Sequence, residues 1–378
     1  MSVWHVITSE YPPDVGGVSD YTRQVSEGLV RMGDEVHVWC PHSGPGGDAN
    51  GPHVHPDLGN MRPADLRCLE QRLSAFPAPR RLLVQWVPHG FGYHSMNVGF
   101  CLWLARRARA GDHVELMVHE PYLELRRGPV RHAVMACVHR LMTIVLLRAA
   151  RKVWIAIPAW ERLLRPYALG RTLPMQWLPV PSCVSDGHYA STTAVRLKYV
   201  DEGRHLLGHF GSYGVAVTGL LLERLPSIMD GPFTPSLLLL GAGGEQFRAA
   251  LIEQHPDWTD RVHATGYLPP SDLGDHIAAC DLFVQPYPDG ITSRRTSAMA
   301  CLSRGCAVVT TTGHLTEPLW EETGAVAIAD VADTAGFVSA VRSLLEKDDA
   351  RLALGARGQR VCAERFSVMR VVNTLRAA

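Results

Sequence analysis

Short apolar runs alternate with longer amphipathic stretches along most of the chain. The run VWHVIT at residues 3–8 is followed by residues 17–33, where apolar positions recur with helical spacing. This alternation continues to residue 156, breaks in the segment 179–204, which is rich in proline and small polar residues, and resumes at residue 205. Strands that alternate with helices predict parallel sheets with helices on both faces, so we expect an α/β protein with two Rossmann-like halves.

The break also sets the expected domain boundaries. We predict an N-terminal domain at 1–185, a C-terminal domain at 186–364 and a last helix at 365–378 that packs back on the first domain. Ligands of open α/β sheets bind beyond the carboxyl ends of the strands. We therefore expect two domains that face each other across a cleft, with the functional residues in the loops after the strands.

Composition narrows the function classes. Lys+Arg and Asp+Glu are both 37 in 378 residues, so there is no overall basic charge that would indicate a nucleic-acid partner. The nine cysteines contain no CxxC pair, which indicates free thiols in a reducing compartment. The sequence shows neither a signal-peptide pattern nor an uninterrupted apolar run long enough to span a bilayer, so we expect a cytoplasmic location.

Two loops of the first half could carry chemistry. Gly16 and Gly17 follow the first strand and precede a helix, where backbone N–H groups and the helix dipole favour an anion, although they also suit a simple tight turn. His119 ends a later strand and could donate a hydrogen bond or transfer a proton near neutral pH, unless it is an ordinary loop histidine.

Aromatic and imidazole side chains gather after the expected strand at 81–87. We take four of them as candidates for contacting an acceptor: Trp86, His89, Tyr93 and His94. The alternative is that Trp86 is a core residue and the histidines are loop residues. The region 126–152 mixes arginines with a long apolar face, which suits either a buried helix or contact with an anionic membrane.

Two glycine-containing turns stand out in the second half. The run LLLLGAGGEQF resembles a dinucleotide fingerprint, but its last glycine position holds Gln246, so NAD or FAD is disfavoured and a turn close to a nucleotide is expected. The run DGITSRR places Asp289, Arg294 and Arg295 between a strand and a helix. If the helix starts at Ser293, the two arginines diverge by about 100° and only one reaches a ligand.

Taken together, these segments resemble glycosyltransferase family 4, whose members have the GT-B fold. The similarity covers nearly the whole chain and rests on YPPDVGGVSDYTRQVSEGLVRMGDEVHVW, LLGAGG, RVHATGYLPPSDLGDHIAACDLFVQP, the AMA run followed by VVTT, and RFS near the end. The resemblance implies a retaining glycosyltransferase. Such an enzyme moves a sugar from a nucleotide diphosphate sugar, held by the C-terminal domain, to a hydroxyl acceptor held mainly by the N-terminal domain.

The resemblance also implies roles for single positions. The first glutamate of the family's E-x7-E motif, which holds the donor sugar, falls on Asp289, and the second, which holds the ribose, falls on Ser297. His119 would lie near the donor sugar. From the resemblance and from the residues themselves, the candidate catalytic residues are His119, Asp289 and Arg294. The candidate donor-binding residues are Gly16, Gly17, Ser212, Gly243, Gly266, Tyr267, Leu268, Gly290, Ile291, Thr292, Ser293, Arg295 and Ser297.

The chain departs from the family where the diphosphate would bind. Ser212 and Thr218 stand where the family has an arginine and a lysine on the diphosphate. Because a diphosphate in a partly dry cleft needs cationic partners, our hypothesis is that Arg294 or Arg295 supplies the missing charge. Asp289 is also shorter than glutamate by one methylene, so the sugar could sit differently.

The resemblance implies no cofactor and a front-face substitution in which the donor's β-phosphate takes the acceptor's proton. No cluster of residues with metal-ligand spacing is visible, so we expect no metal. Three alternatives stay open. The chain could be a sugar-phosphate synthase, a nucleotide-sugar epimerase, or a binding subunit without turnover.

Overall fold

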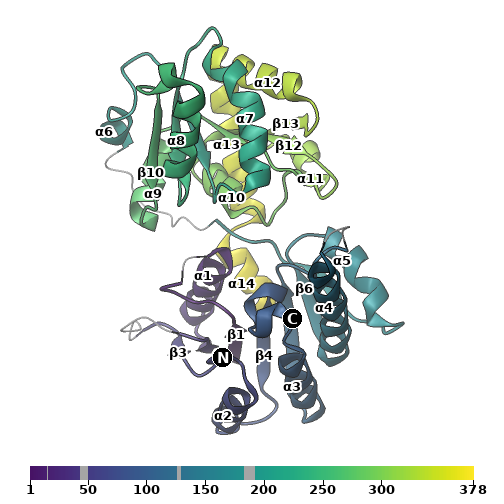
Figure 1. Cartoon of the computed structure of the whole chain (residues 1–378). Helices are drawn as coiled ribbons and strands as arrows, with labels where there is room; N and C mark the ends of the chain where they lie inside the picture. Colours follow the sequence, from purple (N-terminus) through teal and green to yellow (C-terminus); the bar gives the residue numbers. More distant parts are fainter. Residues whose placement is uncertain (15, 43–49, 126–128, 183–191) are drawn as a thin grey trace. The chain divides into compact units, whose positions relative to one another are not determined.

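The computed structural model describes residues 1–14, 16–42, 50–125, 129–182 and 192–378. The chain forms two compact units: Met1–Val180 with Val368–Ala378, and Pro181–Ser367. The boundary predicted between residues 185 and 186 lies outside the described residues. Each unit is a parallel sheet with helices, which confirms the predicted fold class (Figure 1).

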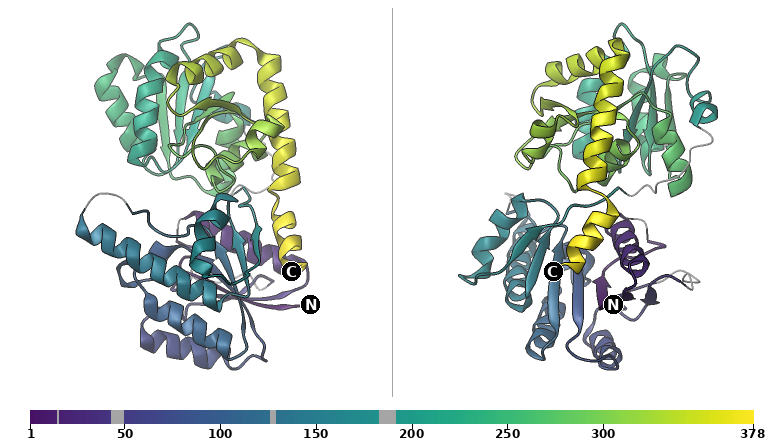
Figure 2. Two further views of the ribbon diagram at one scale, coloured as in Figure 1. Left: turned by 90° about the vertical axis from the view of Figure 1, so that its right-hand side faces the viewer. Right: turned by 180° about the vertical axis from the view of Figure 1, so that it is seen from behind.

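The first unit is built on seven strands in the order β3-β2-β1-β4-β5-β6-β7. The strands are β1 (Val3–Thr8), β2 (Glu35–Trp39), β3 (His53–His55), β4 (Arg81–Trp86), β5 (His113–Val118), β6 (Lys152–Ile155) and β7 (Met175–Trp177). The helices are α1 (Gly17–Arg31), α2 (Pro63–Leu73), α3 (Val98–Arg109), α4 (Val130–Ala149), α5 (Ala159–Leu164) and α14 (Val368–Arg376). Helices α3 and α4 lie on one face of the sheet and α14 on the other (Figure 2).

The second unit is built on six strands in the order β10-β9-β8-β11-β12-β13. The strands are β8 (Leu206–Phe210), β9 (Ser236–Leu240), β10 (Val262–Gly266), β11 (Leu282–Gln285), β12 (Ala307–Thr312) and β13 (Ala327–Asp330). The helices are α6 (Thr192–Arg196), α7 (Val215–Met229), α8 (Gly244–Gln254), α9 (Pro270–Ala278), α10 (Thr296–Ser303), α11 (Leu319–Thr323), α12 (Thr334–Glu346) and α13 (Asp348–Arg365). All strand pairs are parallel, so the carboxyl ends of the six strands meet at one edge.

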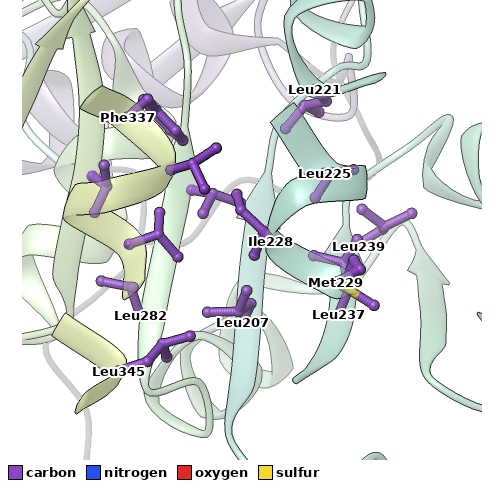
Figure 3. Packing of buried hydrophobic residues seen from close by; sticks show 14 of the residues in the cluster. Leu207, Leu221, Leu225, Ile228, Met229, Leu237, Leu239, Leu282, Phe337 and Leu345 are labelled. Carbon is purple, nitrogen blue, oxygen red and sulfur yellow. The ribbon is translucent and has the colours of Figure 1, made fainter. Parts of the chain in front are cut away.

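The core of the second unit forms where α7 and α12 cover the sheet (Figure 3). Leu207 and Leu282 point from β8 and β11 into this layer, and Leu225 of α7 and Phe337 of α12 meet them there. All four are almost completely buried. The apolar runs that predicted these strands and helices therefore form one continuous core.

The C-terminal helix α14 belongs to the first unit, where it packs on α1. Gly28 of α1 permits this approach, because a Cβ at that position would lie 2.7 Å from the Val372 side chain. Arg376 pairs with Asp34 at 2.9 Å, and the Asp34 side chain is fully buried.

A row of histidines crosses one edge of the first sheet. His5 of β1 lies opposite His37 of β2, which lies opposite His53 of β3, and the ring centroids are 5.3 and 5.1 Å apart. His37 Nδ1 is 3.0 Å from His55 Nε2. Burial lowers the pKa of His5 to about 4 and that of His55 to about 4. Near neutral pH these two rings are uncharged and pack like other aromatic side chains.

Candidate functional site

The loops after β11 and β12 form the most tightly built part of the candidate site. Gly290 has a φ of +85° and lies against Gly313, and a Cβ on either glycine would overlap atoms of the opposite loop. The Leu315 N–H donates to the Asp289 carbonyl at 3.1 Å. These contacts require glycine at both positions and fix the backbone of Asp289 in space.

Buried threonines of β12 hold the chain that leads to this turn. Thr311 Oγ1 donates to the Tyr287 carbonyl at 2.7 Å and accepts the Tyr287 N–H at 2.8 Å. Thr310 Oγ1 donates to the Gln285 carbonyl at 2.7 Å. The threonines at the end of β12 therefore hold the backbone at residues 285–287, just before the turn, by hydrogen bonds.

Both arginines of the turn point to one carboxylate oxygen. Nη2 of Arg295 is 3.3 Å from Oδ2 of Asp289, and Nη2 of Arg294 is 3.7 Å from the same atom. Helix α10 begins at Thr296, so the condition that a helix starts at Ser293 is not met. Both arginines precede the helix, so its rotation of about 100° per residue does not separate them, and the argument that only one reaches a ligand loses its premise.

The backbone N–H groups of the turn are largely used within the chain. Gly290 donates to Tyr287, Ile291 donates to Thr311, and Ser293 donates to the carboxylate of Glu317 at 2.8 and 3.1 Å. These bonds occupy the amides of three of the four residues, 290–293, that the family resemblance assigns to the sugar and phosphate.

Glu317 is a site residue that sequence reasoning missed. Its side chain accepts from Ser293 N–H, from Ser293 Oγ and, at 2.7 Å, from Trp320 Nε1. Only 5% of Glu317 is exposed, and burial raises the pKa of its carboxyl. Glu317 lies 24 residues beyond Ser293 in the chain, so no local motif links them, and only its position after the threonine strand could have suggested it.

Ser297 and Tyr287 pair beside the arginines. Tyr287 Oη and Ser297 Oγ are 2.9 Å apart, and the Arg295 guanidinium lies 4.6 Å from the centroid of the Tyr287 ring. Burial raises the pKa of Tyr287 to about 12, so the phenol stays protonated near neutral pH. Thr292 and Ile291 are fully buried beneath this group.

The remaining donor positions of the second unit follow neighbouring strands at the same sheet edge. Ser212 follows β8, and its carbonyl lies 3.6 Å from the place of a Cβ on Gly243, the first residue before α8. Gly266 ends β10 with a φ of +64°, and Tyr267 beyond it is 59% exposed. The topology therefore brings the loops after β8, β9, β10 and β11 to one edge.

In the first unit, the start of α1 already holds a carboxylate. Glu10 accepts hydrogen bonds from the backbone of Val18 and Ser19, and burial raises the pKa of its carboxyl. A Cβ on Gly16 would lie 2.6 Å from a Glu10 carboxylate oxygen. Gly16 and Gly17 thus shape a place for an anion, and Glu10, which sequence reasoning missed, occupies it.

His119 follows β5 and is 7% exposed. Its Nε2 lies 2.9 Å from Oε1 of Gln85, and Tyr21 meets the imidazole edge-on at 4.8 Å between centroids. Burial lowers the pKa of His119 to about 3. His119 is therefore a neutral hydrogen-bonding group, and the expected proton transfer near neutral pH does not suit it.

The four acceptor candidates separate into different environments. Trp86 is 2% exposed and stacks on Phe91 at 5.1 Å, so it belongs to the core, as the alternative interpretation had it. His89 and His94 are exposed. The side chain of Tyr93 lies outside the described part of the structure. In the described ranges, no three His, Cys, Asp or Glu side chains are grouped so that they could hold a metal ion.

Solved structures resemble the chain over its whole length. Sucrose-phosphate synthase from Thermosynechococcus elongatus matches with a TM-score of 0.72 at 16% identity, covering 100% of this chain and 97% of that one. Anabaena HepE in complex with UDP-glucose matches with 0.70 at 14% identity, covering 100% and 98%. WaaG, a glycosyltransferase involved in lipopolysaccharide biosynthesis, matches with 0.69 at 12% identity, covering 99% and 98%. A search of curated proteins by sequence finds no match.

These matches, with the two parallel α/β units, define a protein of the GT-B fold. Residues 204–347 also match the family model of the glycosyl transferases group 1. Through this segment, which contains the turn of Asp289, Arg294 and Arg295, the chain is similar to the group 1 glycosyltransferases. This confirms the resemblance to glycosyltransferase family 4.

Proposed function

We propose that the protein is a retaining, metal-independent hexosyltransferase that uses a nucleotide diphosphate sugar and a hydroxyl acceptor. The observation that carries the proposal is the convergence of Arg294 and Arg295 on Asp289 at the carboxyl edge of the second sheet. This arrangement places two cations and one hydrogen-bond acceptor where ligands of α/β sheets bind. It supports the hypothesis that Arg294 and Arg295 replace the arginine and lysine that the family has at the positions of Ser212 and Thr218.

In the proposed reaction, the bond between the sugar C1 and the β-phosphate oxygen breaks and a bond from C1 to the acceptor oxygen forms on the same face. The acceptor's proton passes to the departing phosphate oxygen, so no side chain needs to act as the base. The arginines would stabilise the charge on the leaving nucleoside diphosphate. Asp289 would accept hydrogen bonds from the sugar hydroxyls.

UDP-sugars are the first donors to test, because HepE was solved with UDP-glucose. We expect calorimetric titration with UDP-, GDP-, ADP- and dTDP-sugars to find one donor that binds, and slow release of its nucleotide in parallel. Arg294→Ala and Arg295→Ala should each weaken that binding by about tenfold, the loss of one charged hydrogen-bond partner. The assignment of the arginines is wrong if neither variant weakens it.

Product analysis separates the remaining alternatives. A glycosyltransferase releases a nucleoside diphosphate and a glycoside, and a sugar-phosphate synthase is the special case in which the acceptor is a sugar phosphate. A nucleotide-sugar epimerase yields a new nucleotide sugar and no free nucleotide. A binding subunit yields no product although the donor binds.

We also propose that this protein is cytoplasmic and attaches peripherally to an anionic membrane through α3 and α4. The outward stripe of α4 is apolar, with Val130, Val134 and Leu141 between 49 and 78% exposed, and Leu102 of α3 is 48% exposed. Helix α4 is long and apolar enough to span a membrane by length and composition, and 33% of its most apolar window is buried.

Charge favours a lipid surface over a second copy of the chain. Residues 98–111 and 129–152 contain no Asp or Glu, whereas exposed arginines flank the apolar stripe at Arg106, Arg131 and Arg148. Two such surfaces would repel each other, and anionic lipid headgroups would complement both the apolar stripe and its rim.

Sedimentation with vesicles tests this surface. The protein should pellet with phosphatidylglycerol-containing vesicles and stay in solution with pure phosphatidylcholine vesicles. Leu141→Glu should lower the bound fraction several-fold, and Leu352→Glu, the same change at an exposed leucine of α13, should not. Failure of the parent protein to pellet with anionic vesicles would overturn the proposal, and self-association that Leu141→Glu abolishes would assign the stripe to an interface between copies.

A further inference from the structure

We infer that Asp289 competes with the phosphates of the ligand for Arg294 and Arg295, and so makes the enzyme hold a nucleotide sugar more tightly than the bare nucleoside diphosphate. The inference rests on the proposed function, because it assigns those arginines to the phosphates. It adds a specificity-determining role to Asp289, separate from any contact with the sugar.

The competition follows from which atoms are engaged. In the structure both arginines direct Nη2 at a single oxygen, Oδ2 of Asp289. A phosphate oxygen that takes hydrogen bonds from these Nη2 atoms competes with Oδ2, and the phosphate charge competes with the carboxylate for both guanidinium groups. The side chains are 31, 19 and 22% exposed for Asp289, Arg294 and Arg295, so the three charges interact in a partly desolvated setting.

The arginines are the partners that can move. The backbone of Asp289 is fixed by the Leu315 N–H and by the close contact of Gly290 with Gly313. An aspartate side chain has two rotatable bonds, whereas each arginine has a long flexible stem. Binding of a phosphate would therefore draw the guanidinium groups away from a carboxylate that stays in place.

The cost of separating this cluster depends on the ligand. A nucleotide sugar brings hydroxyl groups that can donate to Asp289 when the arginines turn to the phosphates. A bare nucleoside diphosphate lacks the hydroxyls of the transferred sugar, so Asp289 would lose its donors and lie beside a second negative charge. After transfer, the return of both arginines to Asp289 would favour release of the nucleoside diphosphate product.

The test compares two ligand types on matched variants. Calorimetry measures the Kd of UDP, GDP, ADP and dTDP and of the corresponding sugar nucleotides for the parent, Asp289→Asn and Asp281→Asn. Asp281 is also partly buried and paired, with Arg196 at 2.9 Å, but it precedes β11 while Asp289 follows it. Asp281→Asn thus removes the same charge at the opposite sheet edge.

We expect Asp289→Asn to lower the Kd of the cognate nucleoside diphosphate about two- to thirtyfold, as the loss of two partly exposed ion pairs suggests, while the Kd of the sugar nucleotide changes little or rises. Asp281→Asn should change neither Kd. This gain in affinity for the nucleoside diphosphate should vanish in the triple variant Asp289→Asn/Arg294→Ala/Arg295→Ala, because it depends on the two arginines.

Three results would count against the inference. Parent-like or weaker diphosphate binding by Asp289→Asn overturns it and leaves the proposed function intact. A gain that persists in the triple variant shows that removal of a charge, not release of the arginines, is responsible. If neither the parent nor Asp289→Asn binds any ligand of the panel, the proposed function itself fails.

Discussion

Acid should lower the free energy of unfolding of the first unit, because the His119 imidazole is buried in its neutral form. The imidazole is buried and its pKa is lowered from 6.5 to about 3. The unfolded chain therefore binds this proton more readily than the folded chain. As the pH falls below 6.5, protonation of His119 stabilises the unfolded state, so the free energy of unfolding decreases. Above that pH this decrease is absent.

The magnitude depends mainly on the unfolded chain. At about pH 5 the pH lies about 1.5 units below the pKa of the unfolded imidazole. Protonation then lowers the free energy of unfolding by about 2 kcal/mol, at about 1.36 kcal/mol per unit. A folded pKa one unit higher would change this figure by only about 0.1 kcal/mol, because the folded imidazole would still be mostly neutral. His119→Gln, which keeps a donor for Gln85, should remove that part of the pH dependence.

Urea unfolding of the full chain at about pH 7.5 and about pH 5, followed by tryptophan fluorescence, measures the difference. The signal reports mainly the first unit, which contains Trp4, Trp39, Trp86, Trp103, Trp154, Trp160 and Trp177, seven of the nine tryptophans. As a control, Trp160→Phe removes the bond from Trp160 Nε1 to the His119 carbonyl and leaves the imidazole in place. It should lower stability equally at both pH values. A His119→Gln variant with the parent's pH dependence would show that His119 is not a buried neutral group.

Three further substitutions test the packing of the second unit, each by urea unfolding. Gly313→Ala should cost about 1–3 kcal/mol, because its Cβ would overlap the backbone of Asp289, and unchanged stability would contradict the close contact of the two loops. Leu225→Ala should cost about 2–5 kcal/mol as a fully buried side chain of α7, and a loss below about 1 kcal/mol would mean that the site collapses or is not core. Glu317→Ala should cost about 1–3 kcal/mol, since the buried Ser293 N–H loses its acceptor, and Glu317→Gln should recover part of this loss.

The strand and helix order could be predicted because strongly apolar runs leave few options. The runs at β1, β4, β9 and β12 are long and end in polar or glycine residues, and each forms a parallel strand. The edge strands β3, β7 and β13 and the helix α2 were not predicted. Three-residue strands such as His53–His55 are too short to show a period, and their pairing depends on the neighbouring strand.

The place of the candidate site could be predicted, but its internal geometry could not. Loops after parallel strands meet at one edge, so Asp289 and its neighbours had to lie there. Helix α10 begins at Thr296 although Ser293 is a favoured N-cap residue, and the actual cap, Arg295, makes no side-chain capping bond. Ser293 instead bonds Glu317, a tertiary contact that outweighs the local preference.

The residues that sequence reasoning missed share one physical cause. Groups that attract an anion, such as the first amides of α1 or the paired arginines, are unfavourable when left without a partner in a partly buried place. Within the chain Glu10 satisfies the amides of α1, Asp289 pairs with the arginines and Glu317 accepts from the amide of Ser293. Family resemblance assigns the donors at such sites to the ligand and Asp289 to the sugar, but it says nothing of Glu10 or Glu317. A phosphate that binds these N–H donors must compete with the carboxylates. Asp289→Asn removes one competitor and keeps both arginines, so its effect on phosphate affinity measures that competition directly.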